Sequence, residues 1–150
     1  MSATSLYHTA GLRFWNQVRN KANSVPTTLY LLLRTLDGTS GHTSDAAAAD
    51  TLSSNLNEVS TSGTGYARIA ITVNSTNLAE TLSGINSLLT YAASTFNFTG
   101  TVTGITHAAL ATTSDNTGVL LCSAALSVTR NVANGDSLAV TFKELLETGS

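Results

Sequence analysis

Charged residues are scarce in this 150-residue sequence, at 11% of the chain, where an ordinary globular domain has roughly a quarter. Seven basic and nine acidic side chains leave a net charge of −2, which gives no global reason to expect a nucleic-acid partner. Disordered chains combine low hydrophobicity with high charge, so a hydrophobic content of 42% argues against disorder. Ser, Thr, Asn and Gly take the place of charge, as is typical of β-strands with polar outward positions.

Cysteine and long apolar runs are also rare. Cys122 is the single cysteine, so the chain can form neither an internal disulfide nor a thiolate metal cluster. No apolar run approaches the ~20 residues that a membrane-spanning helix needs. The N-terminus lacks the charged start and continuous apolar centre of a signal peptide. We therefore expect synthesis in a cytoplasm and no membrane partner.

The stretch "EVSTSGTGYARIAITVN" (58–74) is a candidate phosphate-binding loop, because it places two glycines before a hydrophobic run. A phosphate loop requires its glycines to lead into a helix, with a Lys-Ser/Thr pair or a full GxGxxG run. Here Gly63 and Gly65 lead into the alternating pattern of a β-strand, and neither motif is present. We predict that both glycines are turn or bulge positions.

Other signatures of chemistry are equally absent from the sequence. There is no GxSxG elbow, the acidic residues are scattered, and Cys122 lies on the apolar side of its predicted strand. His42, Asp45 and Asp50 could touch one hard cation, but such a spacing in a Ser/Thr-rich loop is common by chance. We predict that the protein is not an enzyme and holds neither a metal nor a cofactor.

The first 25 residues have a different character from the rest of the chain. "TAGLRFWNQVRNKANSVP" has the period of a helix, capped by Ser5 or Thr9 and ended before Pro26. Aromatic side chains occupy its apolar stripe, basic residues flank it, and no Asp or Glu occurs among residues 1–25. The candidate interface residues are Tyr7, Arg13, Phe14, Trp15, Arg19 and Lys21.

Three interpretations of this helix stay open. It could cover an open face of the β-domain, with Trp15 as its anchor. It could be an arm that grips another subunit, with the aromatic stripe buried and the basic flanks against acidic neighbours. Its pattern also permits an interfacial membrane helix, although the apolar face is short and only three charges support it.

Beyond Pro26 the hydrophobic period changes from 3.6 to 2. "TTLYLLLRTL" (27–36) is apolar on both faces, as a doubly covered strand would be, and residues 37–65 form a long polar loop. The segment 77–95 fits a helix in its first half slightly better than a strand. Asn134-Gly135 predicts a hairpin turn.

Short strands separated by turn signals continue to the C-terminal end. The pattern predicts a mainly β fold, an antiparallel β-sandwich or jelly-roll-like domain over residues 26–150. A basic amphipathic N-terminal helix or arm over residues 1–25 would precede it.

Four segments in a fixed order carry a family resemblance: "PTTLYLLLRTLDG", "NEVSTSGTGYARIAIT", "FNFTGTVTGITHAALATTSDNTGVLLCSAALS" and "VANGDSLAVTF". Across residues 26 to 143 they resemble a family of small virion structural proteins of tailed bacteriophages. The resemblance implies a β-rich, non-enzymatic protein of the assembled particle, made in the host cytoplasm and located in the virion.

On this resemblance we expect a capsid cement or decoration protein that binds and stabilises the assembled head. Its partners would be the major capsid protein or other virion subunits, and the protein itself would be a homo-oligomer, a dimer or trimer. One alternative is a tail or neck structural component. Another is a carbohydrate-binding host-recognition module, in which Tyr66, Tyr91 and Trp15 would stack on sugars.

Overall fold

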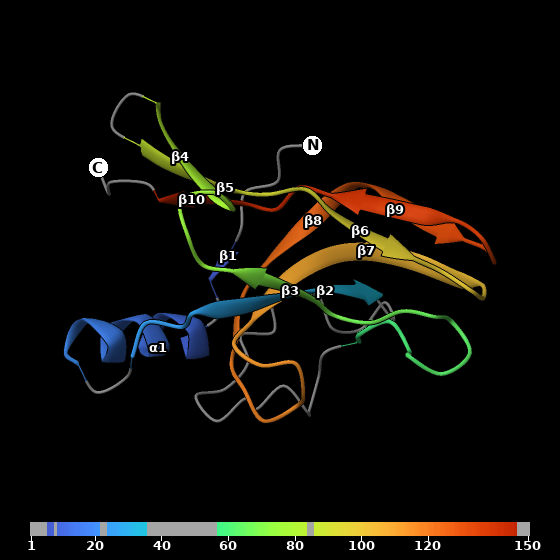
Figure 1. Cartoon of the computed structure of the whole chain (residues 1–150), viewed down its shortest axis with the longest axis horizontal. Coiled ribbons are helices and arrows are strands. Elements are labelled where there is room, and N and C mark those ends of the chain that lie inside the picture. The colour runs from blue at the N-terminus through green and yellow to red at the C-terminus, as the bar shows by residue number, and fades with distance from the viewer. Residues whose placement is uncertain (1–5, 8, 22–23, 36–56, 84–85, 147–150) are drawn as a thin grey trace.

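Antiparallel strands make up most of the computed structural model, which describes residues 6–7, 9–21, 24–35, 57–83 and 86–146 (Figure 1). These ranges contain ten strands and one helix, which confirms the mainly β prediction. In chain order they are β1 (Leu6–Tyr7), α1 (Thr9–Arg19), β2 (Thr28–Thr35), β3 (Ile69–Thr72), β4 (Leu78–Ser83), β5 (Asn86–Tyr91), β6 (Ser94–Asn97), β7 (Val102–Ala111), β8 (Leu120–Val132), β9 (Ser137–Val140) and β10 (Lys143–Leu146).

The largest sheet has five strands in the order β1-β8-β7-β2-β3. Within β2 the four consecutive residues from Leu31 to Arg34 are all buried. Leu31 and Leu33 belong to the main core on one face of this sheet, whereas Leu32 packs in a second cluster with Ala109 of β7. Because both faces are covered, β2 is the doubly covered strand that its sequence predicts.

Smaller sheets lie above the five-stranded sheet in the view of Figure 1, with the orders β10-β5-β4 and β6-β9. The main core joins the two levels, since Leu31 and Leu110 of the large sheet share one cluster with aromatic residues of the smaller ones. Tyr91 and Phe142 meet there edge to face, with ring centroids 5.8 Å apart. The arrangement is consistent with the predicted sandwich.

Residues 78–83 and 86–91 correct the preference for a helix in this region. They form the antiparallel pair β4–β5, with Leu78 opposite Tyr91 and Leu82 opposite Ser87. The apolar spacing favoured a helix because Leu78 and Leu82 are four residues apart, but Leu82 is 75% exposed and covers no core. Strand pairing, and not a buried helical stripe, therefore decides the conformation.

Asn134-Gly135 is a turn but not the predicted hairpin. Gly135 has φ of +90°, yet β9 pairs with β6 and not with β8. The amide of Gly135 donates to the carbonyl of Phe98, and the amide of Phe98 donates to the carbonyl of Asp136. These bonds draw the turn to the end of β6, so the chain crosses here from one sheet to another.

Chain segments near the N-terminus meet β8. Tyr7 lies in β1, opposite Cys122, so it is in a strand and not on the predicted helical stripe. Helix α1 begins at Thr9, contacts β8 and ends at Arg19, followed by Lys21 with φ of +63°. No helix in the described ranges is long and apolar enough to cross a membrane.

The second part of the predicted 37–65 loop runs beside β2; residues 37–56 lie outside the described residues. Glu58 forms a bridge with Arg34, and the amide of Val59 donates to the carbonyl of Leu33. Residues 57–65 are thus attached to the large sheet, and this attachment positions the polar network described next.

Candidate functional site

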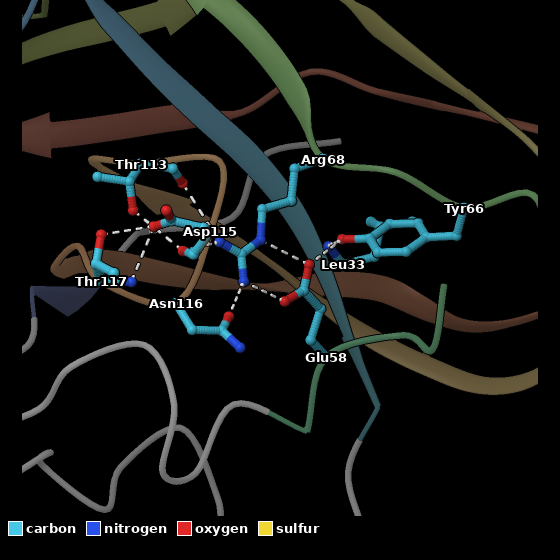
Figure 2. A network of polar contacts seen from close by, with 8 residues as sticks. All are labelled: Leu33, Glu58, Tyr66, Arg68, Thr113, Asp115, Asn116 and Thr117. Atoms are coloured by element: carbon cyan, nitrogen blue, oxygen red, sulfur yellow. Dashed lines mark hydrogen bonds and ion pairs between the residues drawn. The ribbon is translucent and has the colours of Figure 1, made fainter. Parts of the chain in front are cut away.

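Arg68 holds together three segments that are far apart in the sequence (Figure 2). Its guanidinium approaches Glu58 with two nitrogens, Nη2 at 2.6 Å from Oε2 and Nε at 2.9 Å from Oε1. Tyr66 donates its hydroxyl to the same Oε1 at 2.8 Å and accepts the backbone amide of Leu33 at 3.0 Å. Glu58 therefore receives three hydrogen bonds, and the chain of contacts ends on strand β2 of the large sheet.

The opposite side of the guanidinium reaches the loop between β7 and β8. Nη1 donates to the backbone carbonyls of Thr113 and Asp115, and Nη2 donates to Oδ1 of Asn116 at 2.8 Å. Asp115 stabilises this loop in turn, because its carboxylate accepts the hydroxyl and the amide of Thr117. We call these eight residues the Arg68 network: Leu33, Glu58, Tyr66, Arg68, Thr113, Asp115, Asn116 and Thr117.

Glycines allow the chain to present Tyr66 and Arg68 in this way. Gly63 and Gly65 both have φ of +71°, a conformation that favours glycine, so the predicted turn role of this pair is confirmed. A Cβ on Gly100 would lie 2.1 Å from the carbonyl oxygen of Gly63. The amide of Thr99 donates to the carbonyl of Thr64 at 2.8 Å. The two loops are therefore in direct backbone contact.

Electrostatics favour a protonated Tyr66, a charged Arg68 and an ionised Asp115. Burial, followed by the neighbouring Glu58 carboxylate, raises the pKa of Tyr66 well above its usual range. The hydrogen bond to Glu58 raises the pKa of Arg68, and bonds from Thr117 lower the pKa of Asp115. The protonated Tyr66 hydroxyl donates to Glu58, and the charged Arg68 guanidinium holds this carboxylate and the 113–117 loop together.

An open depression of about 590 Å³ adjoins the Arg68 network. Its lining comes from the segments 58–61 and 67–68 and from residues 114–116. The polar groups of Glu58 and Arg68 at this depression already hydrogen-bond to one another and to the 113–117 loop. The network therefore shapes the surface of the molecule here.

A family model for the podophage GP4 fiber I protein gp80 matches residues 13–146. The chain belongs to this family. No curated protein matches the chain. The match confirms the resemblance to phage virion structural proteins, and it identifies the chain as a phage structural protein located in the virion. A fibre family supports the tail-component alternative better than the capsid cement expectation.

Two of the six candidate interface residues, Phe14 and Trp15, lie next to each other on α1. Their rings meet edge to face at 5.4 Å, and both half-buried side chains pack against the main core. The observed packing agrees with the interpretation that α1 covers the β-domain and that Trp15 is its anchor.

The other candidate interface residues lie in β1, in α1 and just after α1. Tyr7 is in β1 and Arg13 in α1, while Arg19 at the end of α1 and Lys21 just after it are exposed. Contact of any of the six with another subunit stays a prediction.

The host-recognition alternative expected three exposed aromatic rings to stack on sugars, and this expectation is wrong for two of the three. Tyr66 is 3% exposed and Tyr91 is 2% exposed. Tyr66 stacks instead on Phe96 inside the core, with ring centroids 5.7 Å apart. Neither ring can receive a saccharide from solvent, and Trp15 of α1 is half-buried against the main core.

Buried polar side chains also occur on β8, where Cys122 donates its thiol to Oε1 of Glu144 at 3.2 Å. Burial, followed by the Glu144 carboxylate, raises the pKa of the Cys122 thiol. On the opposite face of the sheet, Arg34 donates to Oγ of Ser123 at 3.2 Å. Among the described residues, no group of three His, Cys, Asp or Glu side chains is placed to hold a metal ion.

Cys122 is expected to resist thiol reagents in the folded protein. Its side chain is fully buried and its raised pKa keeps the reactive thiolate scarce. Ellman's reagent should therefore label the native chain only as fast as it unfolds, and should label it at once in denaturant. Rapid labelling of the native protein would contradict the buried position of β8.

The Arg68 network was not predicted from the sequence, although Glu58, Tyr66 and Arg68 stand within the "EV…GYAR" part of the family resemblance. One usable signal is present. In a chain with few charges, the acidic Glu58 and the basic Arg68 are ten positions apart, and a pair of glycines lies between them. This spacing allows the chain to fold back and form an ion pair.

Proposed function

We propose that this protein is a structural component of the phage tail, a fibre subunit that acts mechanically and catalyses no reaction. The observation that carries the proposal is the match of residues 13–146 to the fiber I protein family. Its partners would be neighbouring virion subunits. The capsid cement role has less support, because the family is named for a fibre.

The geometry of the Arg68 network supports a mechanical role. A fibre subunit must keep its shape while force is applied through its neighbours. Arg68 ties the Glu58 segment and the 113–117 loop together, and Tyr66 ties both to β2. Bidentate contacts between guanidinium and carboxylate are among the stronger and more directional polar contacts in proteins. The loops at this end of the sheet are thereby fixed.

Copy number distinguishes the tail proposal from the cement expectation. A tail fibre subunit should be present at a small fraction of the copy number of the major capsid protein, whereas a cement protein covers the head in comparable number. Quantitative gel densitometry of purified virions measures this ratio directly. A ratio near one would favour the head and contradict the tail proposal.

We further propose that the exposed basic end of α1 meets an acidic surface of a neighbouring subunit. The double substitution Arg19→Glu with Lys21→Glu should lower incorporation into virions at least severalfold, because like charges across an interface repel. Incorporation is measured by gel analysis of particles from a complemented mutant phage. Arg19→Gln with Lys21→Gln is the milder matched control.

Both positions are exposed, so far-UV circular dichroism should be unchanged. This design avoids deleting residues 1–25, which would remove the partner of β8 and the cover over the core. Normal incorporation of the double variant would contradict the role of α1 but would leave the fold and the tail location untouched.

A further inference from the structure

Two strands of the described chain have edges that no described strand covers. β4 is the outer strand of the order β10-β5-β4. β8 is covered by β1 only at Cys122 and Ser123, so no described strand pairs with its outer edge over residues 124–132. Uncovered edges present rows of backbone donors and acceptors that can add a strand from another chain.

Exposed apolar side chains mark both edges. Among the described residues, three large hydrophobic side chains are exposed: Val25 at 61%, Leu82 at 75% and Val128 at 56%. Leu82 lies on β4 and Val128 on β8. From Ser127 to Asn131 every residue of β8 is exposed, so both faces of this segment meet solvent.

A bulge interrupts the pairing of this part of β8 with β7. His107 pairs with Ala125 and Ile105 pairs with Arg130, so a single residue of β7 lies opposite four residues of β8. The amide of Gly104 donates to Oδ1 of Asn131 at 2.9 Å and holds the bulge in place. Val128 is one of the extra residues of β8, it has no partner residue on β7, and its side chain is 56% exposed.

We propose that β4 of one protomer adds antiparallel to the outer edge of β8 in a second copy of this chain. One register places three complementary pairs on the same face of the joined sheet: Leu82 opposite Val128, Glu80 opposite Arg130 and Leu78 opposite Val132. Two pairs are apolar and the central pair has opposite charges, which are stabilising combinations across strands.

Neighbouring registers are less favourable. Side chains alternate between the two faces of a strand, so a shift of one residue would move every side chain to the opposite face. The nearest alternative registers are therefore shifted by two residues. A shift in one direction places Glu80 opposite Val128, and a shift in the other places it opposite Val132. Antiparallel pairing of β4 with a copy of itself about Glu80 would place two carboxylates opposite each other. The charges thus select β8 as the partner edge.

The joined sheet also keeps both cores on one side. Val132 belongs to the main core of its own protomer, and Leu78 packs against the main core of its own. The proposed register places these two side chains opposite each other, so both point to the same face. The contact uses different surfaces on the two copies, so it generates a closed ring or an open filament.

Sedimentation velocity of the purified full chain over a range of concentrations tests the proposal. The chain should form oligomers whose population rises with concentration. Glu80→Arg and Arg130→Glu, each alone, should raise the dissociation constant about tenfold or more, because each opposes like charges. The combined exchange Glu80→Arg with Arg130→Glu should restore association. Ser114→Glu, which adds a charge to the exposed loop between β7 and β8, away from β4 and from residues 124–132 of β8, is the matched control and should have no effect.

Cysteine trapping tests the register. Thr81 and Thr129 are both exposed and would lie opposite each other. Thr81→Cys with Thr129→Cys in one chain should give a ladder of disulfide-linked oligomers on a non-reducing gel. Either added cysteine alone can give at most a dimer, because the native Cys122 is buried. A monomeric wild-type chain, or oligomers unaffected by the single reversals, would overturn the proposal. So would failure of the exchange to restore association. The result is independent of whether the protein belongs to the tail.

Discussion

Arg68→Ala is expected to lower the free energy of unfolding by about 3 kcal/mol, because it leaves a partly buried carboxylate without its cation. The side chain of Arg68 is 8% exposed and that of Glu58 is 17% exposed, so water can only partly replace the lost contact. The substitution also removes the donors to the 113–117 loop. Urea unfolding followed by far-UV circular dichroism measures the change as a lower midpoint.

Matched variants separate the ion pair from general effects of removing an arginine. Arg19→Ala removes an exposed arginine from α1 and should change stability by less than about 0.5 kcal/mol. Arg68→Lys keeps the charge but loses the two-pronged geometry, so its effect should be intermediate. Removing Glu58 together with Arg68 should cost less than the sum of the two single changes. Equal effects of Arg68→Ala and Arg19→Ala would contradict a central role for the Arg68 network.

Gly100→Ala should also destabilise the protein strongly, although it adds only a methyl group. The new Cβ would lie 2.1 Å from the backbone oxygen of Gly63, and a backbone atom cannot move aside as a flexible side chain can. Overpacking of this kind costs about 1–3 kcal/mol, and a backbone clash belongs at the upper end of that range. Thermal unfolding by circular dichroism provides the measurement.

Gly63→Ala is the informative comparison for Gly100→Ala. Gly63 has φ of +71° and open space around its Cβ position, so alanine there meets only the conformational cost of about 1–2 kcal/mol. Gly100→Ala should therefore be the more harmful of the two. If Gly100→Ala were as stable as the wild type, the contact between the Gly63 and Gly100 loops would be contradicted, and with it the positioning of Tyr66 and Arg68.

Local patterns predicted the conformation where a single segment contains the whole signal. "LYLLL" is apolar at consecutive positions because both faces of β2 are covered, and this can be recognised in one segment. The glycines before β3 were predictable for a similar reason, since positive φ is a local property. β4 was not, because the same leucines satisfy a helical stripe, and only pairing with β5 decides between the two.

The Arg68 network depends on contacts that sequence spacing cannot supply. The loop that receives the guanidinium lies 45 or more positions away from Arg68. Tyr66 could be expected on a surface or in a core, and its burial follows from its position above Phe96 and beside β2. The hairpin expected at Gly135 failed for the same reason, since bonds to Phe98 and the pairing with β6 redirect β9.

Location on the particle is the most direct test of the proposed tail role. Electron microscopy of intact virions labelled with gold-conjugated antibody against this chain shows where the protein sits. We predict gold confined to the tail and its fibres, with bare heads. Gold distributed evenly over the head surface would contradict the tail role and favour the capsid cement role.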